Sequence, residues 1–427
     1  MKIIKYSDAN FNEVVEALVN RLDVDVTSQD ETVKHIIREV KEDGDLALLK
    51  YTNKFDRTTY VIEHLQVRPE EIRTAYKKLS GKELEALKAA SSNIRKFHEK
   101  QVQESWEYTE DGVSLGQMVR PLHTVGIYVP GGKASYPSSV LMNAIPAKVA
   151  GVKQIVMCSP TPGGEISPST LVAADLAGVD VIFKVGGAQA VAAMAYGTAT
   201  IPRVDKIVGP GNIYVALAKR LVYGHVDIDM IAGPSEILII ADTSARPEFV
   251  AADLLSQAEH DEQAVAILVT PSEALAQAVV KELEIQKGKL KRQSIIAASL
   301  GSQCRIIVVN SLEDAVELSN CIAPEHLELA LEDPRKWVTR IENAGAVFLG
   351  HYTPEAIGDY LAGPNHVLPT SGTARFFSPL GVYDFIKRTS LISYTREALS
   401  KSAESCGTLA YMENLDAHGN AVKIRVS

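Results

Sequence analysis

The spacing of hydrophobic positions changes near residue 106. Between residues 10 and 103, apolar residues recur every three or four positions, which predicts helices over 10–22, 31–54 and 70–103. Beyond residue 106 the apolar residues alternate with polar ones, and we expect a hairpin of strands at 106–108 and 113–120 around the turn Glu110-Asp111-Gly112. The chain therefore begins with a helical region and continues into a region that contains sheets.

From residue 124 onward, short apolar strands alternate with segments of helical spacing. Strands are expected at 124–129, 154–158, 181–185, 206–208, 237–241, 266–270 and 306–309. Strand–helix–strand units are typical of parallel sheets. Because both halves of this region show the pattern, we expect an α/β fold with two related, incomplete Rossmann-like domains, a helical N-terminal extension and a small C-terminal extension.

Three predicted strands of the first half end in glycine-rich turns that lead into helices. These turns are Tyr128-Val129-Pro130-Gly131-Gly132, Gly186-Gly187-Ala188-Gln189 and Gly209-Pro210-Gly211-Asn212. Ligands bind outside the carboxyl ends of parallel strands, so the turns could form a nucleotide crevice. None has the GxGxxG spacing of the usual dinucleotide fingerprint. The glycines could equally serve only to make tight turns.

Composition narrows the class of protein. With 427 residues, of which 46% are hydrophobic and 23% charged, the chain resembles ordinary soluble globular proteins. A net charge of -9 argues against a nucleic-acid or anionic-membrane surface, and no apolar run has the length of a signal peptide or a membrane span. The four cysteines are scattered and form no CxxC pair, which favours reduced thiols and a cytoplasmic location.

Histidines with amide or carboxylate neighbours gather in the second half of the chain: His260, His326, His366 and His418. Gln257 and His260 are three residues apart in a helix predicted over 247–263, so they share a face and could form half of a metal site. A zinc site with nitrogen and oxygen ligands could be completed by His418 and by the carboxylate of Asp359. Each histidine could instead be structural, and the absence of an HExxH motif argues against a zincin-type protease.

Glu325 and His326 form a separate pair on a loop that is expected after a helix end. The unperturbed pKa of histidine, near 6.5, suits it to accept a proton from an alcohol or thiol at neutral pH. Adjacent acid and imidazole groups could therefore act as two proton acceptors of different strength. The alternative is that the pair caps backbone groups at the helix end.

Many ordered blocks of the sequence resemble the histidinol dehydrogenase family, and they extend over nearly the whole chain. Besides the three glycine turns, they include 232–236 (AGPSE), 257–261 (QAEHD), 323–327 (APEHL), 363–370 (GPNHVLPT) and 378–383 (SPLGVY). The resemblance implies oxidation of L-histidinol to L-histidine through bound L-histidinaldehyde, the last two steps of histidine biosynthesis. It also implies one zinc per subunit, NAD as the cofactor, and a homodimer of intertwined subunits with the active site at their interface.

The resemblance also implies roles for particular residues. The zinc ligands would be Gln257, His260, Asp359 and His418, and the two proton acceptors Glu325 and His326. NAD would contact Tyr128, Gln189 and Asn212. The substrate would contact Ser235, Gln257, His260, His326, Asp359, Glu413 and His418, with His366 nearby. In these roles His326 takes the hydroxyl proton, Glu325 activates the water that hydrates the aldehyde, and Glu413 and His418 complete the site of the partner subunit.

We expect the chain to divide into four parts. Residues 1–20 would be the N-terminal extension, 21–127 with 236–379 a first α/β domain, 128–235 a second, NAD-contacting domain, and 380–427 a C-terminal extension that reaches the partner. Two other functions remain open from the residues alone. One is a zinc hydrolase in which the glycine turns are only structural, and the other is a zinc-stabilised binding protein without catalytic activity.

Overall fold

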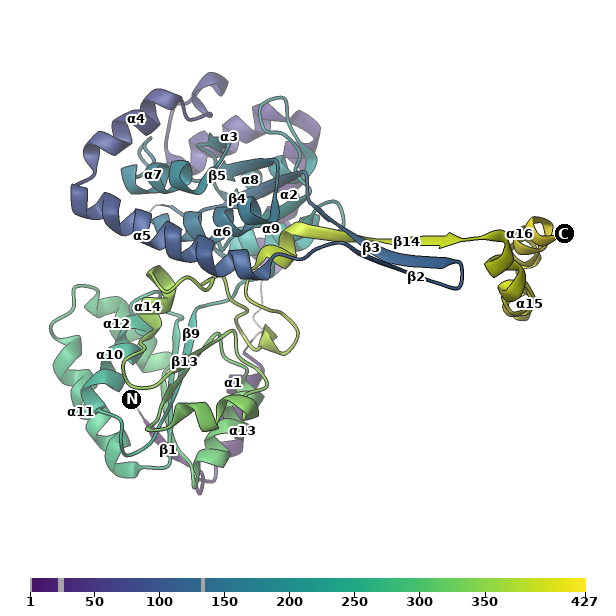
Figure 1. Ribbon diagram of the computed structural model, residues 1–427. Helices are drawn as coiled ribbons and strands as arrows, with labels where there is room; N and C mark the ends of the chain where they lie inside the picture. Colours follow the sequence, from purple (N-terminus) through teal and green to yellow (C-terminus); the bar gives the residue numbers. More distant parts are fainter. Residues whose placement is uncertain (1, 22–26, 132–134) are drawn as a thin grey trace.

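Two parallel sheets and one antiparallel sheet organise the chain (Figure 1). The structure is a computed structural model that describes residues 2–21, 27–131 and 135–427. The predicted helix end at Leu22 and the last glycine of the first turn, Gly132, lie outside the described residues. The α/β class and the two parallel sheets agree with the prediction.

The larger sheet has six parallel strands. Their order is β1 (Ile3–Lys5), β11 (Arg305–Val308), β10 (Val265–Thr270), β9 (Glu236–Ala241), β12 (His326–Ala330) and β13 (Ala346–Leu349). Alternate residues of a strand face opposite sides of its sheet. Ile237 and Ile239 of β9 pack with α10 (Pro247–Ala258), α11 (Glu273–Lys287) and α12 (Gln293–Ser302), whereas Leu238 and Ile240 pack with α1 (Phe11–Val19) and α13 (Leu312–Ile322). Burial on both faces explains the continuous apolar run of this strand.

The smaller parallel sheet has five strands. Their order is β6 (Val181–Phe183), β5 (Gln154–Cys158), β4 (Thr124–Tyr128), β7 (Lys206–Val208) and β8 (Asp227–Ile228). One face is covered by α2 (Thr27–Asp43), α3 (Asp45–Asp56), α8 (Gly187–Tyr196) and α9 (Ile213–Val222). The other face is covered by α4 (Pro69–Lys78), α5 (Gly81–His98), α6 (Pro137–Ala150) and α7 (Pro168–Ala177).

The N-terminal helices pack differently from the expected grouping of 21–127 with 236–379. Helices α2 to α5 contact α6 to α9 around the five-stranded sheet. Strand β1, which lies within the expected extension 1–20, is instead an edge strand of the six-stranded sheet. An amphipathic stripe indicates that a helix packs on some apolar surface, but it does not indicate which sheet provides that surface.

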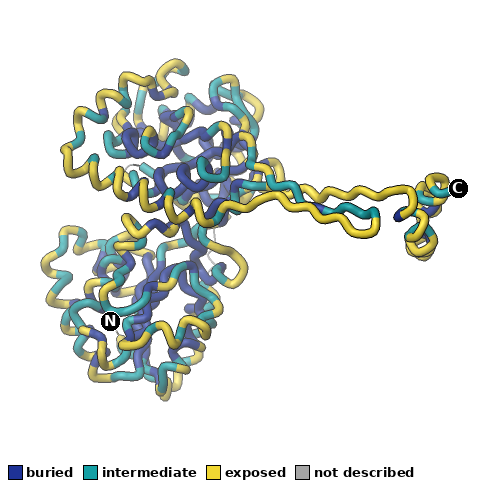
Figure 2. Tube along the Cα trace, viewed as in Figure 1, coloured by how far each residue is buried: buried dark blue, intermediate teal, exposed yellow. Residues whose placement is uncertain are grey.

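A long arm projects from the two domains (Figure 1). Its ribbon contains β2 (Trp106–Glu110), β3 (Val113–Pro121) and β14 (Ile386–Tyr394), which pair antiparallel and include the predicted hairpin. The arm ends in a helical hairpin of α15 (Arg396–Met412) and α16 (Asp416–Val426). All of β2 is exposed, and so is all of β14 after its first residue (Figure 2). Among the described helices, none combines the length and apolar character that a membrane crossing requires.

Candidate active site

The three glycine turns meet at the carboxyl edge of the five-stranded sheet, as predicted. Gly209 has φ +110°, and a Cβ atom there would lie 2.1 Å from the carbonyl oxygen of Tyr128. The backbone N–H of Gly187 donates to the Tyr128 hydroxyl over 3.1 Å. The glycines therefore make tight turns and also allow the turns to approach one another closely.

The predicted NAD contacts all lie at this edge. Tyr128 ends β4 and is buried. Gln189 lies in the first turn of α8, and its buried Oε1 has no hydrogen-bond partner among the described residues. Asn212 caps α9, where its side-chain oxygen accepts from the N–H groups of Tyr214 and Val215. A helix N-terminus at a sheet edge suits an anionic group of a ligand.

Glu325 and His326 lie at the amino edge of the six-stranded sheet. The prediction of a loop was wrong for His326, which is the first residue of β12 and pairs with Ile237 of β9. The parallel register places Glu325 beside Glu236. The Glu236 N–H donates to Glu325 Oε2 over 2.8 Å, and His326 Nδ1 lies 2.9 Å from the Glu236 carbonyl oxygen. Because a carbonyl can only accept, Nδ1 carries a hydrogen, and Nε2 is the nitrogen without a hydrogen whenever the ring is neutral.

Both side chains are buried, and their charges interact. Burial raises the pKa of Glu325 to about 8. Burial alone would lower the pKa of His326, but three carboxylates outweigh this effect and hold it well above 6.5. They belong to Glu355, whose oxygen lies 3.5 Å from Nδ1, to Glu325 at 3.7 Å from the same atom, and to Asp359 at 3.6 Å from Nε2. His326 Nε2 has no hydrogen-bond partner among the described residues, so it is free to meet a ligand.

Helix α14 (Glu355–Tyr360) supplies two of these carboxylates. The sequence interpretation included Asp359 but missed Glu355, although residues four apart share a helix face. Burial raises the pKa of Glu355 to about 8. Glu328 of β12 fixes the start of the helix, because its Oε1 accepts from the Glu355 N–H over 2.7 Å.

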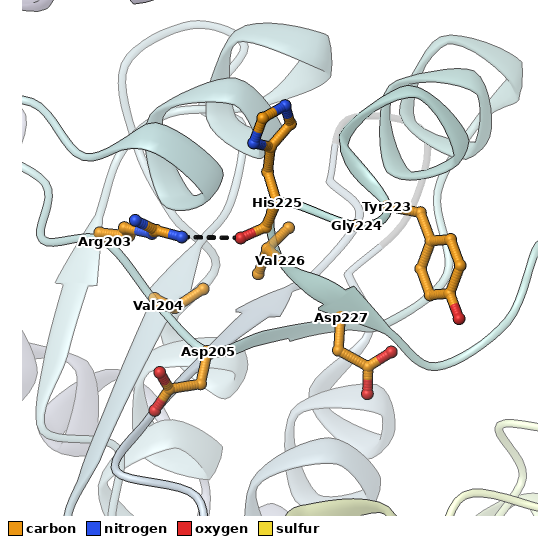
Figure 3. A pocket seen from close by; sticks show the side chains of 8 residues that line it. All are labelled: Arg203, Val204, Asp205, Tyr223, Gly224, His225, Val226 and Asp227. Carbon is orange, nitrogen blue, oxygen red and sulfur yellow. Dashed lines mark hydrogen bonds between the residues drawn. The ribbon is translucent and has the colours of Figure 1, made fainter. Parts of the chain in front are cut away.

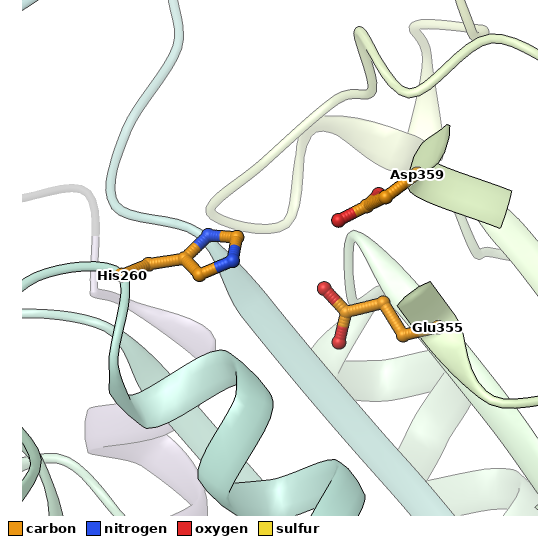
Figure 4. Close-up of side chains that lie close together, drawn as sticks. All are labelled: His260, Glu355 and Asp359. Carbon is orange, nitrogen blue, oxygen red and sulfur yellow. The ribbon is translucent and has the colours of Figure 1, made fainter. Parts of the chain in front are cut away.

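His260 lies beside these two carboxylates (Figure 4). One ligand atom from each of His260, Glu355 and Asp359 lies within 4.8 Å of the others, which is compact enough to surround one metal ion. The predicted helix over 247–263 was too long: α10 ends at Ala258, and His260 lies in the turn that follows. That turn keeps Gln257 and His260 together, since the His260 N–H donates to the Gln257 carbonyl over 3.1 Å.

The side-chain amide of Gln257 is suited to bind a metal ion. The side chain is fully buried, and neither its amide oxygen nor its amide nitrogen has a hydrogen-bond partner among the described residues. An unpaired buried amide costs free energy on the order of 1–3 kcal/mol per polar atom. A metal ion bound by the oxygen would remove part of this cost, so the residues present fit the predicted zinc.

His366 lies where the two domains meet. Its Nδ1 lies 2.9 Å from the carbonyl oxygen of Asp359, and its Nε2 lies 3.3 Å from the hydroxyl of Ser139 in α6. The neighbouring Asn365 donates to the Met142 carbonyl in the same helix over 2.7 Å. Ser235 immediately precedes β9 at the same sheet edge as His326. The carboxyl edge of the smaller sheet thus lies near the amino edge of the larger one.

Two predicted site residues lie far from this group in the same chain. His418 is an exposed residue of α16, and Glu413 is an exposed residue that follows α15. Figure 1 shows both helices at the distal end of the arm, away from both parallel sheets. A single chain therefore does not bring Glu413 or His418 to the other residues.

A pocket elsewhere in the five-stranded domain contains none of the predicted site residues (Figure 3). It is lined by Arg203, Val204, Asp205, Tyr223, Gly224, His225, Val226 and Asp227. These residues precede or begin β7 and β8, so the pocket lies at the amino edge of that sheet, opposite the glycine turns. The pocket therefore lies away from the predicted NAD contacts at the carboxyl edge of the same sheet.

Comparison with known proteins gives a consistent result. The family model described as histidinol dehydrogenase matches residues 19–426. Histidinol dehydrogenases of Syntrophotalea carbinolica and Geobacter sulfurreducens are 56% and 55% identical to the chain; the matches cover 100% of this chain and 99% and 100% of the respective relatives. The crystal structure of histidinol dehydrogenase from Elizabethkingia anophelis aligns with a TM-score of 0.93 at 40% identity, over 100% of this chain and 98% of the other. The chain therefore belongs to the histidinol dehydrogenase family.

Proposed function

We propose that the chain oxidises L-histidinol to L-histidine through a bound aldehyde, with NAD as the oxidant and one zinc ion per subunit. The observation that carries the proposal is the position of Glu325 and His326. Both are buried proton acceptors held by the backbone of Glu236, and they adjoin the group formed by His260 and Asp359. Family membership supports the same reaction.

The zinc would be held by Gln257, His260 and Asp359 from one subunit and by His418 from the arm of the partner. When bound, zinc would supply a redox-inert centre that holds the imidazole and amino nitrogens of the substrate. The positive charge of zinc would also lower the pKa of His326 towards the neutral pH range. It would offset the negative charge of Asp359 and make a positively charged imidazolium nearby less favourable. Glu355 lies close to Asp359 and His260, so its carboxylate, when ionised, would add a negative charge beside the zinc ligands.

His326 would act in both oxidations. Its Nδ1–H bond to the Glu236 carbonyl fixes the ring, so that Nε2 can accept the proton of the substrate hydroxyl. When bound, NAD supplies the acceptor for a hydride, and oxidation of an alcohol to a carboxylate removes four electrons, so two NAD molecules are required. Tyr128, Gln189 and Asn212 would contact NAD at the carboxyl edge of the smaller sheet.

Glu325 would serve the second half of the reaction. In its deprotonated form its free oxygen can remove a proton from a water molecule, which then adds to the aldehyde carbon and gives the hydrate that is oxidised next. Ser235, His366 and the partner's Glu413 would hold polar groups of the substrate. The burial of Glu325 and His326 would limit access of other water to the reactive aldehyde.

The arm supports a homodimer. Its ribbon and helical hairpin expose large apolar side chains, including Trp106, Ile392, Leu409 and Met412. A ribbon with so little core of its own gains stability when a second surface covers it. We infer that the arm packs on the partner subunit and brings Glu413 and His418 to the partner's zinc group.

One assay separates this function from the two alternatives. Purified protein reconstituted with zinc is given L-histidinol and NAD, and NADH and histidine are measured. We expect two NADH for each histidine formed. A zinc hydrolase would show turnover that does not depend on NAD, a binding protein would bind zinc without turnover, and either result would overturn the proposal.

A further inference from the structure

Glu236 holds both proposed proton acceptors through its backbone. Its N–H donates to Glu325 over 2.8 Å, and its carbonyl oxygen accepts from His326 over 2.9 Å. A small displacement of this one residue would therefore move both side chains. Whatever fixes the position of Glu236 therefore also fixes the two proton acceptors, and the carboxylate of Glu236 itself pairs with Arg21.

The side chain of Glu236 is fixed by Arg21. The two form a bidentate ion pair, in which Arg21 Nε and Nη2 contact the two carboxylate oxygens, with 2.7 Å between Nη2 and Oε2. The side chains are 11% and 3% exposed, so the pair is largely shielded from solvent. Paired parallel hydrogen bonds between a guanidinium and a carboxylate set orientation as well as distance.

Arg21 also joins the segment that leads to Glu325. Its Nη1 donates to the carbonyl oxygen of Ile322 over 3.0 Å, and Ile322 is the last residue of α13, three residues before Glu325. The same nitrogen donates to the carbonyl of Leu18 in α1. One guanidinium thus connects the N-terminal segment, the start of β9 and the end of α13.

The charge of Arg21 matters as well as its geometry. A buried carboxylate at Glu236 without a cation would disfavour the charged form of Glu325 beside it. An unpaired buried charge would also tend to draw water or shift the backbone of β9. The guanidinium of Arg21 neutralises the Glu236 carboxylate and so prevents both effects.

We propose that Arg21 and Glu236 act together as positioning residues for the two proton acceptors. The inference rests on the proposed roles of Glu325 and His326. It assigns to the N-terminal segment a part in the reaction, since Arg21 lies outside the strands, turns and helices that carry the other site residues.

The test compares Arg21→Met, Glu236→Gln and the double variant with a matched control, Arg375→Met. Arg375 donates to the carbonyl oxygens of Cys321 and Gly372, so it anchors the same end of α13 without contacting Glu236. For each protein we would measure kcat, the KM values for L-histidinol and NAD, the zinc content and the thermal midpoint.

We expect Arg21→Met and Glu236→Gln to lower kcat roughly 10- to 100-fold, as misplaced catalytic groups do, with zinc content retained and both KM values within about twofold of wild type. The double variant should lose no more than either single one, because the two residues act as a unit. Arg21→Lys should have a smaller loss of kcat than Arg21→Met, since lysine keeps the positive charge but lacks the bidentate guanidinium. Arg375→Met should keep most of the wild-type kcat.

Wild-type kcat in folded Arg21→Met would overturn the inference, and so would an equal loss of kcat in Arg375→Met. If Arg21→Met does not fold, wild-type kcat in both Arg21→Lys and Glu236→Gln would overturn it instead. Failure of the proposed function gives a different result, because Glu325→Gln and His326→Asn would then themselves retain wild-type kcat.

Discussion

The proposed site draws on two regions of opposite character. Glu325 and His326 lie at the start of a strand that is covered on both faces, and their neighbours in the same chain fix them. Glu413 and His418 lie at the end of an exposed arm, where no parallel sheet of the same chain is near (Figures 1 and 2). In the proposed homodimer, each subunit would hold its own two proton acceptors in its core, and we expect the partner to contribute the remaining ligands.

The largest effect is expected from changes in the buried region. His326→Asn should slow oxidation of both L-histidinol and the aldehyde by about 100- to 10,000-fold, because it removes the proton acceptor proposed for both steps. Glu325→Gln should slow the aldehyde step more than the alcohol step. Rates measured separately with the two substrates check this, and equal losses in both steps for both variants would contradict the proposed division of roles.

Zinc binding compares the two regions directly. Gln257→Leu changes a proposed ligand in the core and His418→Ala a proposed ligand on the arm, and we expect each to weaken zinc binding by at least about 100-fold. The measurement is a competition titration with a chelator of known affinity. Exposed His35 serves as a control, because His35→Ala should leave the affinity unchanged. Wild-type zinc affinity in His418→Ala would show that the arm does not provide a zinc ligand.

Gly209 tests the carboxyl edge of the smaller sheet. Gly209→Ala would place a methyl group against the Tyr128 carbonyl at a positive φ, so we expect the KM for NAD to rise by at least about tenfold. The control Gly224→Ala also has a positive φ, but its Cβ would meet nothing within 4 Å. It should cost about 1 kcal/mol of stability without changing the KM. Equal KM values in the two variants would refute a cofactor site at this edge.

The smallest effect concerns pH. Burial raises the pKa of Glu325 to about 8, so at pH 7 most of this carboxyl is protonated and unable to accept a proton. The rate of the aldehyde step should therefore rise roughly tenfold between pH 7 and pH 9 and then level off. A rate that is constant from pH 6 upward would show that Glu325 is ionised throughout or is not the base.

Much of the fold was predictable because buried strands leave a local signal. The apolar runs at 237–241 and 266–270 predict strands of a parallel sheet, and both strands are present and buried. The sequence does not predict which of the two parallel sheets α2 to α5 pack on, since their apolar stripes could pack on either sheet. The end of α10 at Ala258 was also missed, because no glycine or proline marks it.

The site was predictable where residues are adjacent in sequence and not where contacts are distant. Helical spacing predicts that Gln257 and His260 share a helix face; the helix ends before His260, and a backbone hydrogen bond across the following turn joins the two residues. Glu355 was missed because its burial beside His326 depends on the tertiary packing of α14 near the start of β12. The bond between Arg21 and Glu236 joins residues 215 positions apart, and no local pattern marks such a contact.

Complementation between inactive subunits tests the shared site most directly. His260→Ala and His418→Ala subunits would be given different tags, co-expressed and isolated as heterodimers. One of the two sites is then intact, so we predict about half of the wild-type activity per dimer, whereas heterodimers of His260→Ala with Asp359→Asn should remain inactive. Absence of activity in folded His260→Ala/His418→Ala heterodimers would contradict the account.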